Sequence, residues 1–188
     1  MARQRFEFIA GSLGLCFVDT FGDRNGVGIE RLTDPSSLVD WLQAAGLLGA
    51  QADPATQEQL EGARSLREAI HRSGLRIMAA GMPASSDMAI VNAAALKPPL
   101  RPQWRESSIV HMAEVPVEAA LSVIAADALY LFGSPLAARI RTCPECAMMF
   151  VDTSRPGRRR WCSSARGCGN RAKVNRLRAR RAREGMGG

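Results

Sequence analysis

Residues 143–173 read CPECAMMFVDTSRPGRRRWCSSARGCGNRAK, and this stretch decides the architecture of the C-terminal quarter of the chain. It contains four of the five cysteines: Cys143, Cys146, Cys162 and Cys168. A tight Cys-x-x-Cys turn offers two thiolates to one metal ion, and the segment that follows is long enough to return two more. The spacing therefore predicts one closed, tetrahedral metal site of the structural type, with zinc as the metal.

Three other uses of these cysteines remain open at this point. Four thiolates also hold iron–sulfur clusters, two disulfides would pair the same residues, and a redox pair would need only Cys143 and Cys146. The N-terminus, MARQRFE, is charged and has no continuous apolar stretch of the signal-peptide type, so we predict a cytoplasmic protein. Because clustered thiols in a reducing cytosol bind metal more often than they pair, zinc is favoured.

Basic residues are concentrated beside the cysteines. Between Arg155 and Arg183 the sequence has twelve of its 25 arginines and lysines and no acidic residue. Residues 1–142 hold 15 of the 18 acidic side chains, so the C-terminal segment supplies the net charge of +7. Phosphate backbones match such a segment, because each neutralised phosphate releases counterions. We predict DNA as the partner. RNA is the alternative, and an anionic membrane surface or a solvated tail without a partner would suit the same charge.

The end of the chain also has the composition of a helix. Residues 170–183 lack proline and glycine and are rich in arginine, alanine and leucine, which are good helix formers. Such a helix has little apolar surface of its own, so we expect the metal site to anchor its start. The residues predicted to contact DNA are Arg158, Arg159, Arg160, Arg171, Lys173, Arg176, Arg178, Arg180 and Arg181.

Three segments of this region, CPECAMMFVDTSR (143–155), RRWCS (159–163) and CGNRAK (168–173), resemble the CGNR zinc-finger family. The resemblance covers about residues 140–182. It implies a bacterial regulator that joins the finger to an N-terminal α/β domain called ABATE, which is described as a stress-induced transcription regulator. The interval between the last two cysteines is one residue longer than the family pattern, with Gly167 as the extra residue, which concerns the local loop more than metal binding.

The N-terminal part resembles the ABATE domain. Residues 13–20, LGLCFVDT, are similar to its opening segment, with Cys16 and Asp19 in place of an aspartate and an asparagine. Residues 38–42 and 63–70 are similar to its helices. Together the two resemblances cover most of the chain.

These observations predict an α+β protein of two parts. Residues 1–138 are expected to form an ABATE-like body with short strands and several helices. Residues 139–188 are expected to form a small CGNR-type finger, treble-clef or ribbon-like, that ends in a basic helix. Because the body holds nearly all the apolar residues, we expect it to fold without the finger.

The body has clear signals for secondary structure. Capping residues, prolines and helical spacing predict helices over residues 34–45, from 53 to the Pro83 break, and over 84–96 and 116–132. Short apolar runs predict strands over residues 6–9, 13–18 and 26–32, a hairpin over 100–105 and 108–113, and a first finger strand from Ile140.

Two charged residues, Arg67 and Asp127, fall at positions where helical periodicity does not favour full exposure to water. Arg67 interrupts the apolar stripe of its helix, and Asp127 and Glu118 lie on opposite sides of theirs. Because buried charges are normally paired, we expect each to have an ion-pair or carbonyl partner, with one another as one option. The alternative is a small-molecule pocket lined by Arg67 and Asp19.

Two functions of different classes follow. The first is a DNA-binding regulator whose body senses an unknown small-molecule effector or mediates assembly, including homo-oligomers. The second is a ligand-binding protein or enzyme whose zinc module serves protein interaction. The sequence has no triad spacing and no phosphate-binding glycine loop, so we predict that it is not an enzyme. Its most apolar stretch, residues 115–133, contains proline and acidic residues, and predicts no membrane span and no membrane partner.

Overall fold

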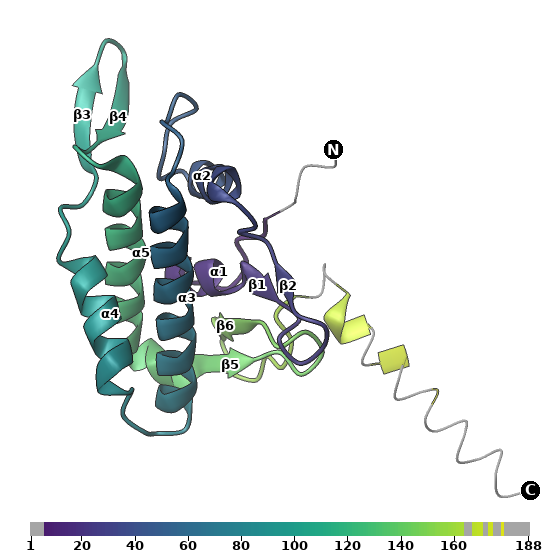
Figure 1. Ribbon diagram of the computed structural model, residues 1–188. Coiled ribbons are helices and arrows are strands. Elements are labelled where there is room, and N and C mark those ends of the chain that lie inside the picture. Colours follow the sequence, from purple (N-terminus) through teal and green to yellow (C-terminus); the bar gives the residue numbers. More distant parts are fainter. Residues whose placement is uncertain (1–5, 164–166, 171–172, 175–177, 179–188) are drawn as a thin grey trace, which may run out of the picture.

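The computed structural model describes residues 6–163, 167–170, 173, 174 and 178. Its centre is a bundle of three mutually packed helices: α3 (Gln57–Met78), α4 (Ser85–Ala95) and α5 (Pro116–Phe132) (Figure 1). A short helix, α1 (Leu13–Val18), packs across α3 and α5, and α2 (Pro35–Ala44) packs against the same two helices. With the short strands described below, the fold is α+β, as predicted. In the part of the chain described, no helix is long and apolar enough to cross a membrane.

Local capping boxes mark the starts of two body helices, α2 and α3. Asp34 caps α2 by accepting a hydrogen bond from the Ser37 amide at 2.8 Å. Thr56 caps α3 in a reciprocal box with Gln59. Both boxes satisfy amides that have no partner inside the helix. The four helices predicted for the body are thus confirmed, although α3 begins after the predicted Asp53 and ends at Met78, before Pro83.

The expectation of a strand over residues 13–18 is wrong, because these residues form α1. Asp127 of α5 accepts hydrogen bonds from the Gly14 amide, at 2.8 Å, and from the hydroxyl of the N-cap residue Ser12. Gly14 also allows close packing, since a Cβ at this position would lie 3.0 Å from the Cβ of Ala128. Ser12 also caps the helix locally by accepting a hydrogen bond from the Leu15 amide at 3.4 Å. The carboxylate that reinforces this start lies 113 positions away, so a long-range contact supports a locally ambiguous apolar run.

The strands of the described residues form three separate antiparallel ribbons. They are β1 (Phe21–Gly22) with β2 (Ile29–Glu30), β3 (Arg101–Arg105) with β4 (Ser108–Met112), and β5 (Ile140–Thr142) with β6 (Met149–Val151). The predicted hairpin is β3–β4, which projects beyond the end of the bundle (Figure 1). Only Ile29–Glu30 of the strand predicted over 26–32 is present. Residues 6–9 form no strand, and Phe8 instead stacks on Trp41 with ring centroids 5.4 Å apart.

One hydrophobic core extends from the helices into the β5–β6 ribbon. The core cluster includes Trp41 and Phe17 of the body together with Phe150 of β6, all nearly inaccessible to solvent. The amide of Val151 donates to the carbonyl of Ala10 at 2.7 Å, so β6 is also tied to the N-terminal segment. The ribbon that begins the finger region therefore packs as part of the body.

Candidate metal centre

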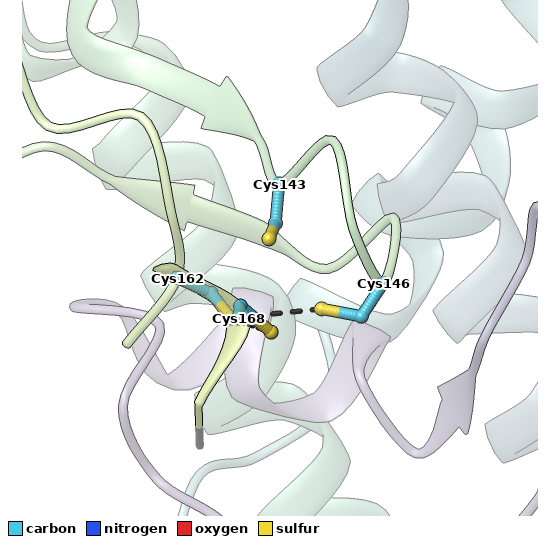
Figure 2. Close-up of side chains that lie close together, drawn as sticks. All are labelled: Cys143, Cys146, Cys162 and Cys168. Carbon is cyan, nitrogen blue, oxygen red and sulfur yellow. Dashed lines mark hydrogen bonds between the residues drawn. The ribbon is translucent and has the colours of Figure 1, made fainter. Parts of the chain in front are cut away.

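The first half of the cysteine site is a tight turn that joins β5 to β6. Cys143 directly follows β5; its amide donates to the carbonyl of Met148, and its carbonyl accepts from the amide of Ala147, each at 2.9 Å. Ala147 adopts a left-handed conformation with φ of 57°. These bonds close the turn and hold Cys143 and Cys146 on the same side of it (Figure 2).

Cys162 and Cys168 complete a cluster in which the four sulfur atoms lie within 4.8 Å of one another (Figure 2). The Cys146 and Cys162 sulfurs are 3.5 Å apart, and those of Cys162 and Cys168 are 3.7 Å apart. A zinc ion with Zn–S bonds of about 2.3 Å would space tetrahedral sulfurs about 3.8 Å apart. The donor set and its spacing therefore suit a metal ion. No disulfide links any of these four cysteines.

Burial and the contacts among the thiols give the cysteines different pKa values. The hydrogen bond between Cys162 and Cys146 lowers the pKa of Cys146 to about 5 and raises the pKa of Cys162. Burial raises the pKa of Cys168 to about 11. One proton thus leaves the cluster easily, whereas the next must leave against the charge already present. A divalent cation supplies the positive charge that would let all four sulfurs be thiolates.

A helical segment begins at the last cysteine. Residues 168–170, 173, 174 and 178 are helical, and Lys173 and Arg178 are exposed. The extra residue of the preceding loop, Gly167, has a φ of 75°, a conformation that glycine adopts at little cost. Trp161 packs against the start of this segment, since a Cβ on Gly169 would lie 3.7 Å from its ring. Four residues predicted to contact DNA lie outside the described residues: Arg171, Arg176, Arg180 and Arg181.

The other three predicted DNA contacts, Arg158, Arg159 and Arg160, lie on the loop that follows β6. Asp152, which is buried at the start of this loop, accepts hydrogen bonds from the Ser154 hydroxyl at 2.6 Å, the Ser154 amide at 2.9 Å and the Arg159 amide at 2.9 Å. The bond from the Ser154 hydroxyl, with those from the amides, lowers the pKa of Asp152. This organising role was not predicted, although Asp-x-Ser after a strand is a signal for such a turn.

Arg67 is a buried structural charge, as the paired interpretation predicted. Its guanidinium donates to both carboxylate oxygens of Glu30, at 2.7 and 2.8 Å, and to Glu68 at 2.8 Å. Arg24 reaches the same Glu68 at 2.8 Å. The option that Arg67 and Asp127 pair with one another is wrong. Asp127 caps α1, and Glu118 pairs with Lys97, because each carboxylate has a nearer partner on a neighbouring segment.

Asp19 and Arg67, the two residues of the suspected ligand pocket, are not brought together in one cavity. Asp19 lines a cavity of about 500 Å³ between the β1–β2 ribbon and the cysteine cluster, whereas Arg67 is not among its lining residues. Carboxylates outnumber cations in its lining, with Asp23 and Glu145 on the wall against one arginine, Arg31, and Cys146 and Cys168 border it. A ligand in it would touch the body and the metal centre at once.

Two models of known families match successive parts of the chain. Residues 11–135 match the model of the family ABATE, described as "Putative stress-induced transcription regulator". Residues 139–181 match the model of the CGNR zinc finger. No curated protein matches the chain significantly.

Proposed function

Because the chain belongs to the ABATE family and carries a CGNR zinc finger after that domain, we propose that it is a DNA-binding transcription regulator. The proposed division assigns residues 1–138 to a body that senses an effector or mediates assembly, and residues 139–188 to the finger that contacts DNA. The observation that carries the proposal is the placement of exposed basic residues around the cysteine cluster: Arg158 and Arg160 on the loop before Cys162, and Lys173 and Arg178 on the helical segment after Cys168.

The proposal assigns one structural zinc ion to Cys143, Cys146, Cys162 and Cys168. Metal analysis of protein purified with a reducing agent should find about one zinc per chain. Cys146→Ser should lower that content strongly. Cys16→Ala is the matched control, because Cys16 is also buried but lies in α1 outside the cluster. Equal metal content in both variants, or none in the wild type, would remove the zinc site from the proposal.

The metal would support DNA binding only by positioning the segments that carry the basic residues. A closed four-thiolate site has no open coordination position, so its contribution is to hold the loop and the start of the terminal helix together. Residues close to this anchor lose little further freedom on binding. Arg158 and Arg160 before Cys162, and Lys173 after Cys168, are therefore suited to phosphate contacts.

Fluorescence anisotropy with a labelled DNA duplex, between about 50 and 200 mM salt, tests DNA binding directly. Several phosphate contacts should give a steep, linear fall of log K with log salt. An RNA duplex of the same sequence distinguishes the two nucleic acids, and Cys146→Ser should lose the affinity. Capture of bound genomic DNA with both proteins would then show whether binding is sequence-specific. A wild-type protein that binds neither duplex would exclude this function.

The acidic cavity behind the cysteine cluster favours a second candidate, a ligand-binding protein whose zinc module serves protein interaction. Its carboxylates, including Asp19, suit a small organic cation, and its volume of about 500 Å³ is typical of a ligand site. Spermidine serves as a probe in isothermal titration calorimetry. Saturable binding that Asp19→Asn weakens would support this candidate if DNA affinity is absent, and would identify an effector site if DNA affinity is present. Self-association stays a prediction from the sequence.

A further inference from the structure

A hollow of about 340 Å³ lies on the finger and is lined by four arginines from two separate segments. Arg141 belongs to β5, and Arg158, Arg159 and Arg160 belong to the loop after β6. The remaining lining residues are Thr142, Pro144 and Gly157, so no carboxylate faces the hollow. We call these seven residues the arginine cleft.

The backbone of the arginine cleft is fixed before any ligand arrives. Buried Asp152 holds the amide of Arg159, and the amide of Gly157 donates to the carbonyl of Ser154 at 3.1 Å. Gly157 has a φ of 62°, which only glycine adopts without strain. The loop is thus a closed turn attached to a buried carboxylate, and a ligand in the cleft would not have to order it.

Two of the four side chains are also positioned by neutral contacts. Arg141 donates to the carbonyls of Ala138 and Ile140, both at 2.8 Å. Arg159 donates to the carbonyl of Trp161 at 2.8 Å, and its guanidinium lies 4.7 Å from the centre of the Phe150 ring. These contacts orient the guanidinium groups without neutralising their charge.

None of the four cleft arginines forms an ion pair in the part of the chain that the structure describes. The ion pairs there involve Arg24, Arg64, Arg67, Arg72 and Lys97. Like charges gathered in one hollow repel one another, and the β5–β6 ribbon and the Asp152 turn hold them there. An anion that enters relieves this repulsion, and guanidinium groups bind phosphate oxygens in bidentate geometry.

We propose that the arginine cleft binds one phosphate group of the nucleic-acid backbone. The proposal rests on the proposed function and adds Arg141, which lies outside the basic run of the sequence, to the contact surface. Both segments of the cleft lead into the cysteine cluster. Thr142 and Pro144 flank Cys143 in the sequence, and Arg160 lies two residues before Cys162. A phosphate held there would set the orientation of the helical segment that starts at Cys168.

The test compares Arg141→Gln with Arg105→Gln, a matched control that removes the same charge from the exposed β3–β4 hairpin. Anisotropy gives the affinity of each protein for a labelled DNA duplex over a salt series. Loss of one phosphate contact lowers the salt slope by about 0.9 and weakens binding about eightfold at 0.1 M salt. We expect this loss for Arg141→Gln and less than about a twofold loss for the control. Equal losses of affinity in the two variants would overturn the proposal for the cleft, while the proposed DNA-binding function would stand.

A second measurement separates the backbone phosphate from free phosphate. The melting temperature of the wild type is compared in sodium phosphate and in sodium chloride of equal ionic strength. One outcome is that phosphate raises the melting temperature of the wild type but not of Arg141→Gln, while neither protein binds nucleic acid. That result would show that the cleft binds free phosphate, and would overturn the proposed function. The absence of both that rise and an Arg141-dependent DNA affinity overturns the cleft. Zinc content and circular dichroism check that each variant folds, and Arg158→Gln replaces Arg141→Gln if the latter does not.

Discussion

At the scale of single residues, the ion pairs of Glu68 with Arg24 and Arg67 contribute to the stability of the folded state. Burial would raise the pKa of Glu68, but the hydrogen bonds and charges of Arg24 and Arg67 outweigh burial and lower it to about 2. A carboxylate with a lowered pKa in the folded state stabilises that state above its unfolded pKa, near 4.5, and loses the contribution as the pH falls toward 2. These ion pairs therefore protect the fold at neutral pH and weaken in acid.

Glu68→Gln should remove this pH-dependent contribution. We expect the variant to lose about 1–3 kcal/mol of unfolding free energy at pH 7, because two arginines lose a charged partner. Between pH 7 and pH 3 the wild type should lose about 1 kcal/mol more than the variant, after allowance for the solvent screening of a half-exposed carboxylate. Urea unfolding at both pH values measures the difference. Parallel losses in the two proteins would show that Glu68 titrates normally.

Two glycines with opposite surroundings give a matched pair of substitutions. A Cβ at Gly14 would approach the backbone and Cβ of Ala128 at 3.0–3.3 Å, whereas a Cβ at Gly62 of α3 would meet nothing within 4 Å. Gly14→Ala should therefore destabilise the protein by about 1–3 kcal/mol, because two packed helices must separate. Gly62→Ala should stabilise it by about 0.5–1 kcal/mol through helix propensity. Thermal unfolding of both variants tests the pair, and a similar effect of the two would contradict the packing of α1 on α5.

At the scale of elements, sequence signals predicted those parts of the fold whose cause is local. α2 and α3 begin with local capping boxes, α5 begins with a proline, and α4, the β3–β4 hairpin and the start of β5 follow patterns within a few residues. α1 has only a weak local signal. Its N-cap residue, Ser12, accepts a hydrogen bond from the Leu15 amide at 3.4 Å, but its apolar run of six residues suits either a strand or a helix, and the shorter bonds are those that Asp127 accepts. Single-sequence reasoning has no access to that contact.

The same distinction applies to the candidate site. The four cysteines were predictable as a group because ligand spacing is a property of the sequence. Arg141 was not, because it precedes the basic run and reaches the cleft only through its pairing with Phe150 across the β5–β6 ribbon. Asp152 differs, because its bonds to Ser154 form a local turn that the Asp-x-Ser pattern could have indicated, whereas its bond to the Arg159 amide seven residues away could not be seen.

The β3–β4 hairpin is an element that the core does not need. All but one of its ten strand residues are exposed, and Trp104 is 79% exposed, against 1% for Trp41. Replacing residues 101–112 by a short glycine–serine turn should change the unfolding free energy by less than about 1 kcal/mol. Trp41→Ala, the control, should cost about 3–5 kcal/mol. A loss of several kcal/mol on removing the hairpin, measured by urea unfolding, would show that it supports the bundle.

At the scale of the whole molecule, the body and the finger share one core. The sequence predicts that residues 1–138 fold alone, whereas the burial of Met149, Phe150 and Val151 against the helices favours one cooperative unit. Phe150, a large side chain of β6, has no solvent exposure. Removing the ribbon would leave its binding surface on α1 and α3 open to water.

Metal removal should therefore affect the entire chain. Treatment of zinc-loaded protein with a chelator should lower the melting temperature of the body helices by at least about 10 °C, in a single transition. Circular dichroism at 222 nm follows these helices. If the helices melt at an unchanged temperature while only the finger unfolds, the two regions are independent folding units, as the division at residue 138 would predict.

The close fit between Gly11 and Val151 also limits how such proteins can recombine. A Cβ on residue 11 would lie 3.3 Å from the Cβ of Val151, and Gly11 has a φ of 82°; on α3, a Cβ on Gly74 would lie 2.7 Å from the Met149 sulfur. A finger taken from another protein would place different side chains against Gly11 and Gly74, and those side chains would be too large or too small for the space. We therefore expect the two parts to be inherited as a matched pair, and hybrids to need compensating changes on the opposite side of the junction.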